Sequence, residues 1–294
     1  MSTARARVAA IAGVLIAAGQ QLPAQSVGKM LESDLRNFGG DVWAVWTSPV
    51  HAHGRDWLIA GSTVALSGLV SIWDDDVDRW MVEHRDASQW SALKEVREGG
   101  IAFSGKTITP IALGALAIGL ITKNQAIQDG IFGCVASYVS GSVVRNQVAY
   151  RLIARRRPAP DKGSPEPPAA DSDDQYDIEL PGQSDWGQHS LPAGHAANVI
   201  ACASFLNHRF SMGVIEPALY VVSTGVGLGR LVDRRHWTSD TVLGMVFGYA
   251  IGKEVAKRSS ARMAKRAMGP SVSTSSFYVT PAGGGISAGW RATF

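Results

Sequence analysis

The chain has 294 residues, of which 46% are hydrophobic and 18% are charged. A charged fraction below the roughly 25% that is usual for soluble domains indicates either a large core or a surface in contact with lipid. The formal net charge of +3 is too small to indicate a nucleic-acid partner, and the basic residues form no stripe with interleaved aromatic residues. The length predicts one domain of about 200–250 residues with additional segments at its ends.

The N-terminus has the organisation of an export signal. Arg5 and Arg7 precede the apolar run Val8–Ala18, and Ala24 lies near a suitable cleavage site. An apolar run of about 11 residues is short for a bilayer core, which needs about 20, so a cleaved signal peptide is favoured over a first membrane helix. We expect residues 1–25 to be a signal peptide and the mature protein to lie in a bacterial cell envelope, in the periplasm or associated with a membrane.

Six apolar segments predict helices, because each is longer than an ordinary strand and none alternates strictly between apolar and polar residues. The segments are Trp57–Trp73, Thr107–Thr122, Ile131–Tyr150, Ala196–Leu206, Met212–Val232 and Thr241–Val255. Their lengths fit both buried core helices and short membrane spans, and the sequence leaves both alternatives open. The predicted fold class is all-α, a bundle of about six core helices. Five tryptophans near the first segment fit either a membrane interface or core packing: Trp43, Trp46, Trp57, Trp73 and Trp80.

Changes in composition divide the chain further. We expect an N-terminal helical part at residues 26–106 and the main helical core at residues 107–260. Within this core, residues 158–190 are rich in Pro, Asp and Gly and predict a long polar loop, which is either a lid over a site or disordered. Residues 261–294 predict a tail with a short β-hairpin, in which Phe277–Thr280 and Ile286–Phe294 flank a glycine turn.

Two smaller features carry structural expectations. The acidic run Asp74–Asp76 follows the first apolar segment, and we expect it to solvate a helix end rather than to bind calcium. Cys134 and Cys202 both lie in apolar helical segments. Buried free thiols are commoner in such segments than a disulfide or a metal pair, so we expect free cysteines.

The stretch RLVDRRHWTSD, from Arg230 to Asp240, places charged groups at the start of an apolar helix. Thr238 or Ser239 can cap this helix, so His236 lies just before its N-terminus, where an anion meets unpaired N–H groups and the positive end of the helix dipole. Asp240 can accept a hydrogen bond from one imidazole nitrogen and leave a lone pair on the other, as a nucleophile requires. The alternative is a capped helix with a surface histidine and arginine.

A second stretch, LPAGHAAN, also ends at the start of a helix. Gly194 carries no side chain at a point where a backbone N–H group can approach an anion closely. His195 follows it and can serve as a general acid for a leaving oxygen. Alone, a Gly-His pair at a helix start is weak evidence for a site.

The third stretch is YRLIARRRP. On a continuous helix Tyr150 and Arg157 share a face, whereas Arg151 points about 120° away from Arg157. We expect this helix to continue to Pro158, which stops it. Arginines at a helix end can complement the helix dipole, or they can clamp phosphate oxygens through their planar forks.

Together, the three stretches resemble the type 2 phosphatidic acid phosphatase superfamily, which includes bacterial class A acid phosphatases and vanadium haloperoxidases. The family signature K-x6-R-P, P-S-G-H and S-R-x5-H-x3-D corresponds here to YRLIARRRP, PAGH and GRLVDRRHWTSD. The resemblance covers residues 131–255, with the three motifs in the family order. It implies an all-helical core and, for the phosphatases, no metal and no cofactor.

The resemblance also implies catalytic roles. His236 would be the nucleophile that attacks phosphorus, and Asp240 would orient it. His195 would protonate the leaving group and then activate water. The residues implied to surround the phosphoryl group are Arg157, Arg230, Gly194, Ala193, Tyr150 and Arg151.

Three positions depart from the family signature: Tyr150 stands where the family has lysine, and Ala193 and Gly229 stand where it has serine. The lysine is the largest loss, because a cation leaves the phosphate site. The sequence leaves open whether Arg151 or Arg155 replaces this cation.

The expected function is a metal-independent phosphatase that acts on a phosphomonoester, a lipid phosphate or a lipid pyrophosphate through a phosphohistidine. Its expected partners are this substrate and a membrane contact, with no nucleic acid, and the oligomeric state is not indicated. One alternative is a haloperoxidase, which alone would need vanadate as a cofactor. The other is a catalytically weakened binding or structural protein of the envelope.

Overall fold

A computed structural model describes residues 27–84, 90, 94–96, 98–100, 108–122, 124–159, 175–180, 188–267, 274–282 and 285–293. The chain divides into two compact units, Met1–Lys257 and Arg258–Phe294. The division falls three residues before the expected boundary at residue 260. The predicted signal peptide and most of the predicted polar loop lie outside the described residues.

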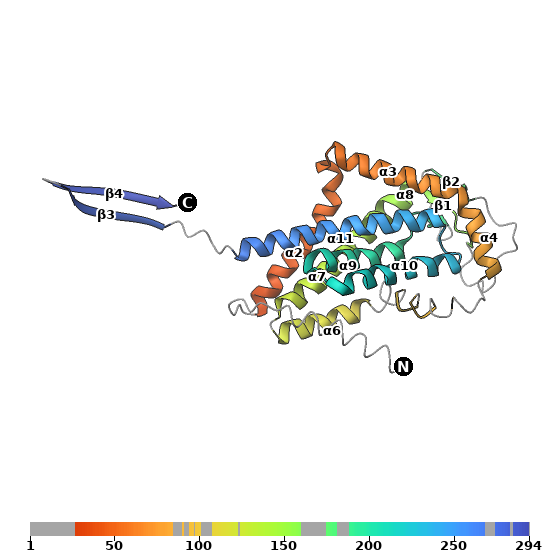
Figure 1. The fold of residues 1–294 in the computed structure, drawn as a ribbon, viewed down its shortest axis with the longest axis horizontal. Coiled ribbons are helices and arrows are strands. Elements are labelled where there is room, and N and C mark those ends of the chain that lie inside the picture. The colour runs from red at the N-terminus through yellow and green to blue at the C-terminus, as the bar shows by residue number, and fades with distance from the viewer. Residues whose placement is uncertain are drawn as a thin grey trace. The chain divides into compact units, whose positions relative to one another are not determined.

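The described part of the first unit is built mainly of helices (Figure 1), so the all-α prediction is confirmed. The N-terminal helices are α2 (Val27–Thr47), α3 (Gly54–Val70), α4 (Asp74–His84) and α6 (Ile108–Ile121), with the short 3-10 turns η1 (Ser48–His51) and η2 (Ser71–Trp73). The later helices are α7 (Gln125–Val144), α8 (Tyr150–Leu152), α9 (Gly194–Phe210), α10 (Glu216–Val232) and α11 (Thr238–Ala267), with the turn η6 (Gly213–Ile215) before α10. Each of the six predicted apolar segments therefore contains a helix.

The segment before Pro158 differs from the prediction. α7 passes into a π-helical turn, η4 (Arg145–Ala149), and the helix ends with α8 at Leu152. Ile153 is extended, and β1 (Ala154–Arg155) pairs antiparallel with β2 (Ile178–Glu179). The prediction that Tyr150 and Arg157 share one helical face is therefore wrong, because the helix stops five residues before Arg157.

α9 lies at the centre of the helical packing (Figure 1), in contact with α7 and α10. α11 also packs closely on α9, because glycines recur at every fourth position of its inner face. A Cβ atom on Gly248 would lie 2.1 Å from the carbonyl oxygen of Ala197, and one on Gly252 would lie 2.1 Å from that of Ala201. The hydrophobic core beside this contact comprises Val45, Ala136, Phe205, Ile251, Val255 and Ala256.

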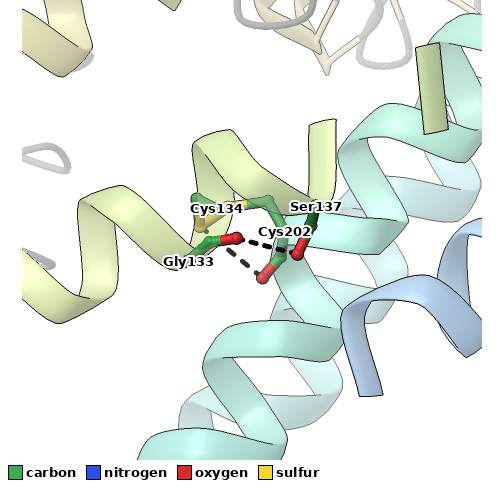
Figure 2. The surroundings of a disulfide bond; sticks show 4 residues. All are labelled: Gly133, Cys134, Ser137 and Cys202. Atoms are coloured by element: carbon green, nitrogen blue, oxygen red, sulfur yellow. Dashed lines mark hydrogen bonds between the residues drawn. A yellow bond between two sulfur atoms is a disulfide. The ribbon is translucent and has the colours of Figure 1, made fainter. Parts of the chain in front are cut away.

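A disulfide joins Cys134 of α7 to Cys202 of α9 (Figure 2), with their Cα atoms 4.4 Å apart. The expectation of free thiols is therefore wrong. The reason is the close approach of the two helices, which also appears at Gly133, where a Cβ atom would overlap the ring of Phe205. An apolar environment favours a free thiol only where no second cysteine lies opposite, and the sequence does not show which helix faces meet.

Large apolar side chains are exposed on the N-terminal helices. The continuous run Gly54–His84 is long and apolar enough to cross a membrane by length and composition, and only 6% of its most apolar window is buried. All five tryptophans of this region are exposed, which argues against core packing as their role: Trp43, Trp46, Trp57, Trp73 and Trp80.

The second unit contains the predicted β-hairpin. β3 (Thr274–Ala282) pairs antiparallel with β4 (Gly285–Thr293), and the register joins Thr274 to Thr293 and Ala282 to Gly285. β3 is longer than the predicted strand Phe277–Thr280.

Candidate active site

The structure brings the three sequence motifs together at the N-terminal ends of α9 and α11. The backbone N–H group of Ala193 donates to the carbonyl of Asp240 at 3.0 Å, which joins the second motif to the third. The indole of Trp237 donates to the carbonyl of Arg156 at 2.7 Å, which joins the third motif to the first, and the Tyr150 hydroxyl donates to the carbonyl of Pro192 at 3.3 Å, which joins the first motif to the second. These contacts close a ring in which each motif touches the other two.

His236 lies in the short connection between α10 and α11 and is buried. Its Nδ1 is 2.8 Å from the carbonyl oxygen of Ser190. A carbonyl oxygen can only accept, so Nδ1 carries the proton and Nε2 keeps its lone pair. Burial lowers the pKa of His236 well below its usual value, and the charges of Arg157 and Arg230 lower it further. His236 is therefore a neutral imidazole with one defined nitrogen available for attack.

Asp240 does not make the hydrogen bond that the sequence predicts. Its carboxylate accepts from the hydroxyl of Ser190, from the backbone N–H of Trp237 at 3.0 Å and from Arg155 Nη1 at 2.7 Å. The partner of His236 Nδ1 is the Ser190 carbonyl instead. Asp240 thus contacts His236 only indirectly. It holds the Ser190 hydroxyl, and the carbonyl of the same residue binds His236. It also caps the N-terminus of α11.

Asp240 belongs to a buried ionic cluster, defined here as Asp74, Arg155, Ser239 and Asp240. Arg155 Nη2 donates to Asp74 at 2.8 Å, while its Nη1 donates to Ser239 Oγ and Asp240. Burial acts to lower the pKa of Arg155. The negative charges of Asp240 and Asp74, and their hydrogen bonds, have a larger combined effect and raise this pKa above its usual value. Burial raises the pKa of Asp240, with Arg155 and Ser190 acting in the opposite direction. The cluster anchors the start of α11 to β1.

The acidic start of α4 is part of the site, which corrects the expectation that it only solvates a helix end. Asp74 is buried and accepts from the backbone N–H of Ser239 at 2.9 Å. This contact satisfies one of the N–H groups that a helix N-terminus leaves without an intrahelical partner. One turn further, Asp78 accepts from Arg234 Nε at 3.0 Å, and Arg234 has the positive φ of 52°. α4 therefore braces the connection that carries His236.

His195 is the second residue of α9 and is partly exposed. Burial lowers its pKa to about 3, and the positive charges of Arg230, Arg145 and Arg157 contribute to that pKa shift. A positive charge on His195 would lower the pKa of His236, so the two imidazoles lie within electrostatic range of each other. The site thus holds two neutral histidines among several guanidinium groups.

Arg157 and Arg230 lie close enough to His195 and His236 to lower the pKa of both histidines. Arg157 is buried, and burial lowers its pKa to about 10. Arg230 is on the last turn of α10, and its Nη1 donates to Asp233 at 3.1 Å. Arg157 follows β1 and Arg230 lies in α10, so these guanidinium groups come from different elements than His195, which lies at the start of α9.

The other predicted binding residues provide no charged side chain to the site. Ala193 is the N-cap of α9 and provides no side-chain cap. Tyr150 is buried, its ring stacks on His189 with centroids 4.4 Å apart, and its hydroxyl donates to the carbonyl of Pro192 at 3.3 Å. Arg151 is exposed. Arg155, the other open candidate for the missing cation, is held by the buried ionic cluster.

Arg145 lies at the site and was missed by the sequence analysis. Its guanidinium fills the space beside Gly194, where a Cβ atom would lie 2.3 Å from Arg145 Nη1. The absence of a side chain at Gly194 leaves room for this guanidinium, which would have to move if a Cβ atom were present. The available signal was that Arg145 carries the one charge in the apolar stretch Ile131–Tyr150.

Comparison with known proteins supports the family resemblance over part of the chain. Residues 151–264 match the family model of the PAP2 superfamily. The family resemblance is confirmed. A stretch of 69 residues is 35% identical to a lipid A 1-phosphatase of Porphyromonas gingivalis, and the match covers 22% of this chain and 15% of that relative. No solved structure gives a significant match.

The PAP2 segment contains His195, His236, Asp240, Arg157 and Arg230, whereas Arg145 and Asp74 lie before it. Among the described residues, no group of three or more His, Cys, Asp or Glu side chains is placed to hold a metal ion. The described geometry provides a nucleophilic nitrogen, a second imidazole able to carry a proton, and cations for an anionic substrate.

Proposed function

We propose that the protein is a phosphatase that hydrolyses a phosphomonoester, a lipid phosphate or a lipid pyrophosphate through a covalent phosphohistidine, without a metal ion. The observation that carries this proposal is the fixed tautomer of His236. Its Nδ1–H donates to the Ser190 carbonyl at 2.8 Å, which leaves Nε2 as a nucleophile in a positively charged site. Membership of residues 151–264 in the PAP2 superfamily supports the same chemistry.

In the first step, the lone pair of His236 Nε2 attacks phosphorus and the bond from phosphorus to the leaving oxygen breaks. Arg157 and Arg230 stabilise the charge on the phosphoryl oxygens. His195 donates a proton to the leaving oxygen, so the alcohol, or the phosphate of a pyrophosphate, departs with its proton. The phosphoryl group is then bound to Nε2 of His236, and because Nδ1 keeps its proton the phosphorylated imidazole ring carries a positive charge.

In the second step, His195 accepts a proton from a water molecule that attacks phosphorus. The bond between phosphorus and Nε2 breaks, the electron pair returns to the imidazole, and inorganic phosphate is released. Through both steps the Ser190 carbonyl holds the Nδ1 proton and stabilises the positive imidazole, as a carboxylate does in other histidine-based sites.

We further propose that the protein acts in the bacterial envelope, next to a membrane. The exposed tryptophans and apolar side chains of α2–α4 support contact with lipid. The disulfide supports an oxidising compartment, in agreement with the proposed signal peptide. Similarity to a protein named lipid A 1-phosphatase favours a lipid phosphate among the candidate substrates.

Hydrolysis of p-nitrophenyl phosphate in the presence of EDTA tests the proposal. Wild-type protein should release phosphate, and rapid acid-free quenching with a ³²P-labelled substrate should trap a label that is stable to base and labile to acid. His236→Ala should abolish both signals while the protein remains folded. Turnover of His236→Ala within a few-fold of wild type would overturn the assignment, and bromide oxidation that appears only after vanadate and peroxide are added would favour the haloperoxidase.

A further inference from the structure

The lysine position of the family is occupied by Tyr150, yet the site does not lack a third cation. We propose that Arg145 supplies the missing positive charge and binds an oxygen of the phosphoryl group. This inference rests on the proposed phosphatase function and assigns a substrate-binding role to a residue outside the family motifs.

The π-helical turn is what directs Arg145 to the site. On a regular α-helix, residues five positions apart point about 140° away from each other. Here the backbone N–H of Tyr150 donates to the carbonyl of Arg145, five residues before it. The wider turn brings the two side chains to the same side, and Arg145 Cζ lies 5.8 Å from the ring centroid of Tyr150. π-turns of this kind occur frequently at functional sites.

The guanidinium of Arg145 lies at the entrance of α9. Its Nε donates to Asn146 Oδ1 at 3.2 Å, while its Nη1 is buried and has no hydrogen-bond partner among the described residues. A buried charged N–H group without an acceptor is costly unless a ligand provides one. Nη1 lies against Gly194, next to the predicted general acid His195, so an anion bound at the start of α9 would meet this group.

The alternative cations are excluded by position. Arg155 is engaged by Asp74 and Asp240 in the buried ionic cluster, and Arg151 is exposed on α8. Tyr150 itself is buried against His189 and offers its ring face to Arg145. In this proposal two residues share the role of the family lysine. Tyr150 occupies the lysine position and lines the site with its ring, and Arg145 supplies the positive charge.

The test compares Arg145→Ala, Arg145→Lys and, as a control for loss of one positive charge, Arg36→Ala, whose side chain is exposed on α2 and pairs with Glu32. The measurements are kcat and KM for p-nitrophenyl phosphate, the Ki of inorganic phosphate and the Tm. Loss of a charge-assisted contact should reduce kcat/KM on the order of 10- to 150-fold and raise the Ki of phosphate. Arg145→Lys should recover part of the loss, and Arg36→Ala should match wild type.

Tyr150→Lys provides a second, independent readout. In the wild-type background the added cation duplicates Arg145 and should give no gain. In the Arg145→Ala background it should restore phosphate affinity, because the charge returns to the family position. Gly194→Ala should displace the guanidinium, and its effect should be much smaller when Arg145 is already alanine.

Three results would overturn the inference. The first is that Arg145→Ala leaves the Ki of phosphate unchanged. The second is that the Arg145 variants lose activity only in proportion to their loss in Tm. The third is that Arg151→Ala is inactive while Arg145→Ala remains active. Each of these leaves the phosphatase proposal intact as long as His236→Ala is inactive. An active His236→Ala would instead remove the phosphohistidine proposal on which the inference depends.

Discussion

Replacing Arg155 with methionine is expected to destabilise the protein more than replacing either of the carboxylates that Arg155 holds. Arg155 donates to Asp74 at 2.8 Å and to Asp240 at 2.7 Å, and both carboxylate side chains are fully buried. Methionine fills a similar length but provides no donor. Arg155→Met therefore leaves two buried carboxylates without their cation, whereas Asp74→Asn leaves the Arg155–Asp240 pair in place.

The magnitudes follow from these contacts. Breaking one buried ion pair by removing a partner typically costs about 3–5 kcal/mol. Since Arg155→Met breaks two, we expect at least about 5 kcal/mol, which approaches the whole stability of many domains. Asp74→Asn loses charge-assisted hydrogen bonds but keeps an acceptor, so a cost of about 1.5–3 kcal/mol is expected.

Urea unfolding followed by circular dichroism, at pH 8 and at pH 5, measures these costs. Burial already raises the folded-state pKa of Asp240 and Arg155 opposes this, so without Arg155 that pKa should rise further above its unfolded value. The folded state then binds more protons than the unfolded state, and its stability falls as pH rises through this range. The deficit of Arg155→Met relative to wild type should be smaller at pH 5. A deficit under about 1 kcal/mol, or a larger deficit in Asp74→Asn, would refute the reasoning.

Three further outcomes are expected. His195→Ala should reduce kcat on the order of 10²–10⁴-fold for an alkyl phosphate and much less for p-nitrophenyl phosphate, and equal losses in steady-state assays would show that it is not the acid. Ser190→Ala should lower kcat with little change in KM, because Asp240 no longer fixes the carbonyl that orients His236, and a change confined to KM would contradict this. Because the folded-state pKa of His195 is about 3, stability should fall as pH drops from about 6.5, by up to about 1.4 kcal/mol per pH unit for this residue. If the stability of His195→Asn falls with pH at the same slope as that of wild type, His195 is not the source of this pH dependence.

The sequence predicted the helices because long apolar segments without strict alternation have few alternatives. It did not predict α4, whose start is acidic. In isolation the run Asp74–Asp76 fits a solvated helix end, and only the fold places Arg155 and Ser239 beside it. The break after Leu152 was missed for a similar reason: the pairing of β1 with β2 depends on residues more than twenty positions away.

The motifs predicted which elements form the site, since three ordered patterns with fixed spacing constrain where the chain must meet itself. They did not predict the hydrogen bonds within it. The Ser190 carbonyl is a backbone group, so no residue type in the sequence marks it as the partner of His236. Asp240 lies close to His236 in the chain and in the fold, but its contacts depend on side-chain directions that spacing alone does not determine.

The electrostatics of the site indicate how His195 could acquire the proton that the first proposed step requires. Without substrate, His195 is neutral because burial and the nearby guanidinium groups hold its pKa at about 3, so it has no extra proton to donate. A phosphate dianion bound among those cations adds two negative charges and opposes both burial and the guanidinium groups. We therefore expect the pKa of His195 to rise and the residue to take up a proton in the bound complex. Substrate binding would therefore prepare the acid, while His236, held by Ser190 and farther from solvent, would stay neutral and nucleophilic.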